Sequence, residues 1–260
     1  MALLHVNFFS DVLGHAVSAD VILPEQRRTL IGMETSAADT FRTLYLLHGL
    51  SDDETIWQRR TSVERYVAGR NMAVVMPDGG RSWYADAVHG SAYMTFVSEE
   101  LPHVMRSFFR GMTDRREDNF IAGLSMGGHG AMKIGLLHPE RFRGIGCLSG
   151  ALDLYRRSQH LCGAEVSEWP AIFGDYETIP GSVNDIRALS GRAAAAGTVL
   201  PAVYMWCGTE DGLLQDSRDA KAYLTEAGFD LSYHESPGSH SWECWDAQIQ
   251  NVLNYFDTLK

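Results

Sequence analysis

The segment "NFIAGLSMGGHGAMKIGLLHPERF", residues 119–142, carries the strongest structural signal in this chain. It begins with a short apolar run, passes through Gly-Leu-Ser-Met-Gly at 123–127, and continues with apolar residues at helical spacing. A serine between two glycines at such a junction fits a sharp strand-to-helix turn, because a side chain at either glycine would collide with the neighbouring strand or helix. The stretch therefore predicts a turn that presents the Ser125 hydroxyl at the carboxyl end of a sheet.

Short apolar or β-branched runs bounded by Gly, Pro or Asp recur along the chain and predict buried parallel strands. These runs occupy residues 42–48, 72–77, 119–124, 143–149 and 201–208, with a last strand at 230–236. Helical stretches lie between or after them, at 62–70, 96–110, 126–138, 213–228 and 247–259. Within the second of these, Pro102 requires a kink or a new start. The alternating N-terminal residues predict two antiparallel strands at one edge, so the pattern indicates an α/β fold with a mostly parallel central sheet and helices on both faces.

Length, composition and charge favour a single soluble domain. The 260 residues suit one α/β domain over 1–260, and 45% hydrophobic with 21% charged residues are typical of a globular protein with a sizeable core. The net charge of −11 would repel nucleic acid and anionic membrane surfaces. We therefore expect neither nucleic acid nor a membrane as a partner.

The segment 151–198 breaks the alternation of strands and helices. Pro, Gly and Trp appear in it, and it is too long for an ordinary connection. We predict an insertion above the sheet, after its sixth strand, with a helix near 183–190. Such an insertion would act as a lid or as a wall of a pocket.

The N-terminal segment lacks the basic region and the small-residue cleavage site of a secretory signal. No apolar run is long enough to span a bilayer. We therefore expect a cytoplasmic protein. The cysteines are scattered without a CxxC pair, which favours buried reduced thiols over a disulfide or a metal site. They are Cys147, Cys162, Cys207 and Cys244.

A serine is a poor nucleophile without a base, and in a strand-turn-helix setting the acid and then the base should follow it in chain order. Asp211 lies in "VYMWCGTEDGLL", in a loop that follows a strand and precedes a helix. His240 lies in "SYHESPGSHSWECWD", in a Pro-Gly-Ser loop between the last strand and the last helix. The order Ser125, Asp211, His240 is that of the α/β-hydrolase fold, and it predicts a catalytic triad.

Nearby residues are rivals for two of these roles. Glu210 and Asp216 could replace Asp211, although Asp216 would lie inside the following helix, a turn too late. His234 could replace His240, but it lies within the strand pattern. The other histidines are expected at the surface or in the packed core, and no HExxH or comparable spacing suggests a metal.

A serine nucleophile of this kind works beside an oxyanion hole, which needs two backbone N–H groups. The residue after the nucleophile, Met126, should supply one of them. Leu50, just after His48-Gly49 in "LLHGLSDDETIW", should supply the other from the end of an earlier strand, and an ordinary strand-to-loop turn is the alternative.

Five blocks of the sequence, taken together and in order, resemble the tributyrin esterase (EstA-like) branch of the esterase D family. Its relatives include S-formylglutathione hydrolases, small feruloyl and acetyl esterases, and mycolyltransferases. The blocks are "LLHGLSDDETIWQRRTSVERY", "VVMPDGGRSWYAD", "FIAGLSMGGHGAMKIGLLHPERF", "CGTEDGLL" and "PGSHSWECWD". They extend from about Arg42 to Asp246, which is nearly the whole chain.

The resemblance implies an α/β-hydrolase fold, a triad of Ser125, Asp211 and His240, and an oxyanion hole from the two amides named above. These residues agree with those chosen from the pattern alone. The chain departs from the family at Gly212, where many members carry a large apolar residue after the acid. The insertion is the part that varies most within the family, so the resemblance does not imply a particular substrate.

The sequence thus predicts a serine carboxylesterase for short acyl esters, acting through an acyl-enzyme without a cofactor. Feruloyl or acetyl esters of plant polysaccharides such as xylan, or S-formylglutathione, are alternative substrates. A non-catalytic binding protein on a hydrolase scaffold is an alternative of another class. Trp57, Trp83 and Trp169 are candidates for an aromatic or sugar site, or for packing in the core. The physiological ester and the oligomeric state, a homo-oligomer included, are left open.

Overall fold

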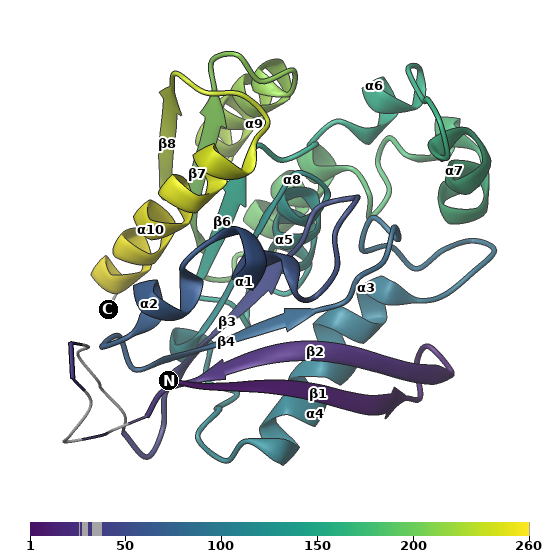
Figure 1. The fold of residues 1–260 in the computed structure, drawn as a ribbon. Coiled ribbons are helices and arrows are strands. Elements are labelled where there is room, and N and C mark those ends of the chain that lie inside the picture. The colour runs from purple at the N-terminus through teal and green to yellow at the C-terminus, as the bar shows by residue number, and fades with distance from the viewer. Residues whose placement is uncertain (26, 28–30, 33–37, 260) are drawn as a thin grey trace.

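The computed structural model describes residues 1–25, 27, 31–32 and 38–259, and one eight-stranded sheet forms its centre (Figure 1). The strands are β1 (Ala2–Ser10), β2 (His15–Leu23), β3 (Arg42–Leu47), β4 (Met72–Pro77), β5 (Asn119–Leu124), β6 (Gly144–Leu148), β7 (Ala202–Gly208) and β8 (Leu231–Ser236). Their order across the sheet is β1-β2-β4-β3-β5-β6-β7-β8.

Strand direction divides the sheet into two parts. Neighbours from β4 to β8 pair in parallel, whereas β1 and β2 form an antiparallel hairpin and β2 pairs antiparallel with β4. This arrangement confirms the predicted α/β-hydrolase fold, including its antiparallel edge. The chain leaves β3 toward β4 on one side and reaches β5 on the other. Loops that diverge at such a switch point leave room for a ligand at the carboxyl ends of the strands.

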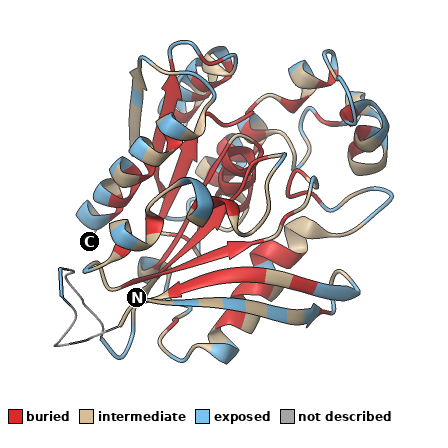
Figure 2. Ribbon diagram, viewed as in Figure 1, coloured by how far each residue is buried: buried red, intermediate tan, exposed pale blue. Residues whose placement is uncertain are grey.

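The central strands are apolar because helices cover both of their faces. Every residue of β4, β5, β6 and β7 is buried, as the continuous red strands in Figure 2 show. Parallel strands that are enclosed in this way have no solvent face and so lose the alternation of polar and apolar residues. The apolar runs of the sequence therefore predicted these strands to within one residue at each end.

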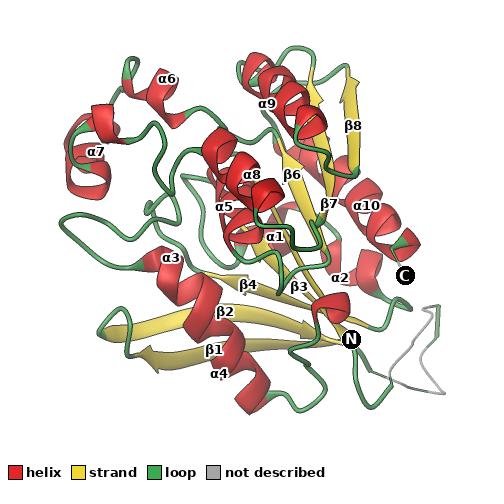
Figure 3. Ribbon diagram, turned by 180° about the vertical axis from the view of Figure 1, so that it is seen from behind, coloured by secondary structure: helices red, strands yellow, loops and turns green. Residues whose placement is uncertain are grey.

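Two helical layers enclose the sheet. One face packs against α1 (Ile56–Arg60), α2 (Val63–Val67) and α10 (Trp242–Thr258). The other face packs against α4 (Leu101–Phe108), α5 (Met126–Leu137), α8 (Ile186–Ala195) and α9 (Leu214–Glu226), which lie in front in the view from behind (Figure 3).

Several helix boundaries differ from the prediction. The helix expected at 96–110 continues from α3 (Tyr93–Thr95) as a π-helical turn, η1 (Phe96–Glu100), before α4 begins with Pro102 as its second residue. The sequence predicted a kink or a new start at Pro102, and the structure has a π-helical turn directly before α4, ahead of a residue that has no N–H to donate. The helix expected at 247–259 begins earlier, at Trp242, because Ser241 is already extended and takes the N-cap position.

The segment 151–198 follows β6, the sixth strand, and contains α6 (Leu154–Ser158), α7 (Glu165–Phe173), the 3₁₀ turn η3 (Tyr176–Thr178) and α8. Figure 1 shows α6 and α7 beyond the ends of the strands. The helix predicted near 183–190 is α8, which packs against α5 and α9. The last part of the segment therefore belongs to the helical layer, and α6 and α7 form the part above the sheet.

Lys133 of α5 joins distant segments from a fully buried position. Its Nζ donates to the carbonyl oxygen of Trp83 at 3.0 Å, in the loop after β4, and to Asn184 Oδ1 at 2.9 Å, just before α8. Burial lowers the pKa of this ammonium to about 7, because the interior solvates its charged form poorly.

We expect Lys133 to give the protein a distinctive dependence of stability on pH. Between about pH 7 and pH 10 the unfolded chain binds a proton at this lysine that the folded chain does not bind. The free energy of unfolding should therefore rise with pH, by at most about 1.4 kcal/mol per unit, and this rise should be absent in Lys133→Met. Urea unfolding of both proteins at about pH 7, 8 and 9 measures the difference.

Lys221→Met, which removes an exposed lysine from α9, is the control and should keep the wild-type dependence. Parallel pH profiles for the wild type and Lys133→Met would contradict the expectation.

Candidate active site

The sharp turn predicted at residues 123–127 lies between β5 and α5. Ser125 has φ 53° and ψ −117°, a conformation that residues other than glycine rarely adopt. A Cβ at Gly127 would lie 2.5 and 2.6 Å from two carbonyl oxygens at the end of β3, and one at Gly123 would collide with the Gly127 backbone. The packing therefore requires both glycines, as the sequence predicted.

Backbone hydrogen bonds tie this turn to the end of β6. The Ser125 amide donates to the Leu148 carbonyl at 2.9 Å, and the Ser125 carbonyl accepts from the Ala151 amide at 3.3 Å. Hydrogen bonds thus hold both the amide and the carbonyl of the strained residue. The position of its side chain follows from the fold.

His240 lies between Ser125 and Asp211. Its Nε2 is 2.9 Å from Ser125 Oγ, and its Nδ1 is 2.8 Å from Asp211 Oδ2. Asp211 lies in the loop between β7 and α9, and His240 lies in the loop between β8 and α10. The structure therefore brings the three predicted side chains into one hydrogen-bonded line.

The surroundings of Asp211 favour its charged form. Burial alone would raise the pKa of its carboxyl, but hydrogen bonds from the His240 ring and the Leu213 amide outweigh burial and hold the pKa below its ordinary value. A carboxylate can only accept, so the proton of a neutral His240 ring lies on Nδ1. Nε2 is then free to accept the proton of the Ser125 hydroxyl.

The rival residues lie in other contacts. Glu210 accepts hydrogen bonds from the Gly238 amide and from the Thr209 hydroxyl. Asp216, in α9, pairs with Arg156 of α6 at 2.9 Å. The His234 ring stacks on Tyr204, with centroids 5.0 Å apart, and bonds to Ser232. None of these three side chains has a hydrogen bond to Ser125 or to His240 in the described part of the chain.

The two amides predicted to bind an oxyanion come from neighbouring loops. Met126 is the first residue of α5, and Leu50 follows β3. Among the described residues, neither amide has a hydrogen-bond acceptor. The first N–H groups of a helix have no partner within it, and the helix end adds partial positive charge there.

An open cavity of about 530 Å³ surrounds the Ser125 side chain. It is lined by Gly49, Leu50, Ser51, Asp52, Arg81, Trp83, Leu124, Ser125, Ala151, Arg157, Asp211, Gly212, Leu213, His240 and Trp245. A cavity of about 390 Å³ between the insertion and α9, and another of about 660 Å³ near α4, lie away from Ser125. Of these three, the first contains a serine hydroxyl within hydrogen-bond distance of a histidine ring, Ser125 Oγ and His240 Nε2.

The three tryptophans proposed for substrate contact lie in different environments. Trp83 lines the cavity, and its ring meets Trp169 edge to face at 5.1 Å. Trp169 is fully buried beneath it, on α7. Trp57 of α1 is also fully buried, and its indole N–H donates to the Leu47 carbonyl at 3.1 Å. The structure therefore buries all three tryptophans, and Trp83, which is 2% exposed, is the one of the three that also lines the cavity.

The sequence did not single out Arg81, Arg157 or Trp245, which also line the cavity. Arg81 bonds to Glu168 on α7 at 2.8 and 2.9 Å, and its Nη1 donates to the Leu50 carbonyl at 3.3 Å. Arg157 pairs with the buried Glu165 at 2.7 Å. The Trp245 ring meets the His240 ring edge to face at 4.7 Å. The ion pairs of Arg81 and Arg157 depend on the folding of the insertion, which no local pattern indicates.

The described residues contain neither a cluster of metal-ligating side chains nor a membrane-spanning helix. No group of three or more His, Cys, Asp or Glu side chains among them could hold a metal ion. Their helices are all too short or too polar to cross a bilayer.

Comparison with known proteins gives consistent matches over nearly the whole chain. A model of the family described as "Putative esterase" matches residues 10–256. An acetyl esterase of Caldicellulosiruptor saccharolyticus is 32% identical over 265 aligned positions, covering 100% of this chain and 99% of that protein.

Two solved structures of Staphylococcus aureus proteins also match nearly the whole chain. Substrate-bound FphF, a fluorophosphonate-binding serine hydrolase, has a TM-score of 0.88 and 32% identity, with 98% of both chains covered. The apoenzyme of the S-formylglutathione hydrolase FrmB has a TM-score of 0.86 and 32% identity, again with 98% of both chains covered.

Proposed function

We propose that this chain, which belongs to the Esterase family and is a carboxylic ester hydrolase, cleaves short-chain acyl esters through an acyl-enzyme on Ser125. The hydrogen-bonded line from Ser125 through His240 to Asp211 carries this proposal. A serine that faces a base, and a base that faces a buried carboxylate, are what nucleophilic catalysis by a hydroxyl requires.

In the first half of the reaction, Ser125 Oγ attacks the ester carbonyl carbon while its proton passes to His240 Nε2. The electron pair of the carbonyl moves to its oxygen, which the amides of Leu50 and Met126 stabilise. Asp211 stabilises the charged ring through Nδ1. The intermediate then expels the alcohol, which takes the proton from His240 and leaves the acyl group on Ser125.

In the second half, water replaces the alcohol. His240 removes a proton from the water as its oxygen attacks the acyl carbon, and the same two amides stabilise the second oxyanion. The proton returns to Ser125 Oγ as the acid departs. In each half His240 accepts one proton and then donates it again, so the cycle needs no cofactor.

The preference for short acyl groups rests on the resemblance to the tributyrin esterase branch and on the acetyl esterase relative. Hydrolysis of S-formylglutathione is the second candidate. It is favoured by the similarity to FrmB and by two arginines, Arg81 and Arg157, at the cavity, because the substrate carries carboxylates. A panel of p-nitrophenyl esters of increasing acyl length, with S-formylglutathione beside it, separates the two.

The proposal keeps the expectation of a cytoplasmic enzyme. Its four cysteines are free thiols, which fits a reducing compartment.

Ser125→Ala tests the function directly. We expect it to fold like the wild type and to lower kcat on p-nitrophenyl acetate by at least about 10³-fold, because the covalent route is removed. A fluorophosphonate probe should label the wild type and leave the variant unlabelled. Near-wild-type hydrolysis by Ser125→Ala, or no hydrolysis by the wild type of any ester, would overturn the proposal, and the latter would favour a binding protein.

Asp211→Asn tests the assignment of the acid. We expect a loss of about 10³ to 10⁴ in kcat with little change in KM, because asparagine can present its NH₂ to the ring, favour the wrong tautomer and remove the stabilising charge. Steady-state kinetics on p-nitrophenyl acetate gives both constants.

Glu210→Gln and Asp216→Asn are the matched controls, since both remove a charge from the same loop and helix start. Each should cost less than about tenfold in kcat. If either proved crippling while Asp211→Asn remained active, the triad would have to be reassigned.

A further inference from the structure

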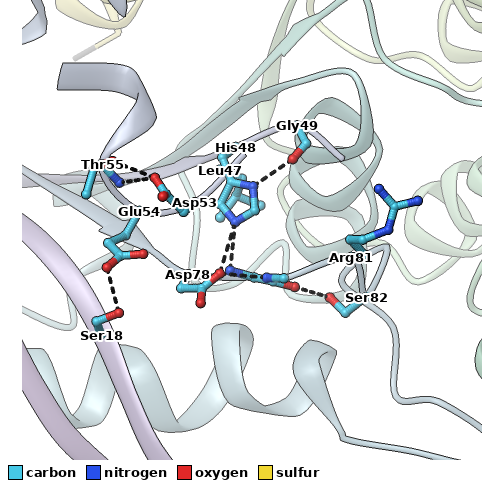
Figure 4. A network of polar contacts seen from close by, with 12 residues as sticks. Ser18, Leu47, His48, Gly49, Asp53, Glu54, Thr55, Asp78, Arg81 and Ser82 are labelled. Atoms are coloured by element: carbon cyan, nitrogen blue, oxygen red, sulfur yellow. Dashed lines mark hydrogen bonds and ion pairs between the residues drawn. The ribbon is translucent and has the colours of Figure 1, made fainter. Parts of the chain in front are cut away.

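The peptide group between Gly49 and Leu50 is held from behind by a buried histidine. His48 follows β3 and is 1% exposed. Its Nδ1 lies 2.7 Å from the Gly49 carbonyl oxygen, and its Nε2 lies 2.8 Å from the Gly79 amide nitrogen. Figure 4 shows the ring between Gly49 on one side and the segment around Asp78 on the other. His48 therefore bridges the loop after β3 and the loop after β4.

These two contacts assign the proton of the His48 ring. A backbone amide can only donate, so Nε2 must offer its lone pair to Gly79. The proton of the neutral ring then lies on Nδ1, where it faces a carbonyl oxygen that can only accept. Both ring nitrogens are satisfied by a single tautomer, and that tautomer donates to Gly49.

The orientation of the Gly49 carbonyl determines where the Leu50 amide points. In a trans peptide the C=O and the N–H of one group project in opposite directions, and the described residues contain no cis peptide. A bond that holds the Gly49 oxygen against His48 therefore turns the Leu50 N–H away from the histidine. A Cβ at Gly49 would lie 3.9 Å from Ser125 Cβ, so this peptide lies beside the nucleophile.

The loop after β4 fixes the position of the histidine itself. Ser82 Oγ donates to the Gly79 carbonyl at 2.6 Å, and the Tyr84 hydroxyl donates to the His48 carbonyl at 3.1 Å. Asp78 Oδ1 lies 3.6 Å from His48 Nε2 and accepts from the Gly80 amide at 2.8 Å. The loop after β4 thus bonds to the ring through the Gly79 amide and to the His48 backbone through the Tyr84 hydroxyl.

We propose that His48 is a positioning residue for the oxyanion hole, and that its Nδ1–H bond to Gly49 aims the Leu50 amide at the developing oxyanion. The inference rests on the proposed function, since it assigns Leu50 as an oxyanion donor. His48 does not touch the substrate in this arrangement. It acts by keeping a donor aligned before the charge forms, which is the form of electrostatic stabilisation that costs no reorganisation during the reaction.

Two polar substitutions separate the two bonds of the ring. In His48→Asn the side-chain amide occupies the place of Nδ1 and can still donate to Gly49, but it cannot reach Gly79. In His48→Gln the longer side chain can still accept from Gly79, but it does not supply the donor to Gly49. We expect kcat on p-nitrophenyl acetate to stay within about fivefold of the wild type in His48→Asn and to fall about 10- to 100-fold in His48→Gln, with KM nearly unchanged in both.

Inhibition by trifluoroacetone gives a readout that a merely structural role would not move. Ser125 Oγ adds to the ketone carbon, its proton passes to His240, and the carbonyl electron pair becomes an oxyanion in the place of the reaction intermediate. The inhibition constant should rise in His48→Gln by the same factor by which kcat/KM falls. In His48→Asn it should remain close to the wild-type value.

His129→Asn and His129→Gln are the matched controls. His129 is also fully buried, and its Nδ1 also lies 3.0 Å from a carbonyl oxygen, that of Ala151. These variants should alter the thermal midpoint as much as the His48 variants do while changing kcat less than about threefold. Equal losses in the two pairs would overturn the proposal, as would equal kcat for His48→Asn and His48→Gln or the reverse order.

A measurement on the wild type needs no variant. Side-chain nitrogen NMR should show His48 protonated at Nδ1 and bare at Nε2, and the opposite tautomer would overturn the proposal. Labelling by a fluorophosphonate separates this failure from failure of the proposed function. If the wild type is labelled at Ser125 and hydrolyses the ester, only the role of His48 is at issue, whereas an unlabelled, inactive wild type refutes the function itself.

Discussion

The arrangement of the site depends on the strained backbone of Ser125. A conformation of this kind costs about 1–3 kcal/mol and persists only when its surroundings leave no alternative. Here the surroundings include two glycines, which pack without side chains against the end of β3 and against each other. Backbone hydrogen bonds also tie Ser125 to the end of β6 and to the residues after it. A relaxed turn would lower the serine away from His240 and would also move the first amide of α5. One local constraint therefore fixes the positions of both the proposed nucleophile and one proposed oxyanion donor.

Much of this could be predicted from the sequence, because the decisive signals are local. Buried parallel strands have apolar runs, and such runs gave β3 to β7 nearly at their observed bounds. The loops of Asp211 and His240 could be placed because each follows a strand and precedes a helix, and the carboxyl ends of parallel strands meet at one edge. The triad geometry then follows from the topology, since β5, β7 and β8 all end at that edge.

The sequence failed where side chains meet across long separations. Trp57 and Trp169 carry no local mark that distinguishes a cavity wall from a core, and both are fully buried. Arg81 was not singled out because its partners, the Leu50 carbonyl and Glu168, lie in two other segments. The role that we infer for His48 was likewise invisible, since it arises from a bond to Gly79, in the turn after β4. Each of these contacts appears only when loops from several strands converge.

The position of His240 between β8 and α10 has a consequence for the synthesis of the protein on the ribosome. Ser125 and the proposed oxyanion donors lie earlier in the chain than His240 and are therefore synthesised before it. His240 follows both Ser125 and Asp211 in the chain, and its ring packs against Trp245 of α10. A nascent chain can therefore carry a formed nucleophile turn and yet have no assembled base. Hydrolysis through the proposed triad therefore requires the segment from β8 to α10 as well as the turn at Ser125.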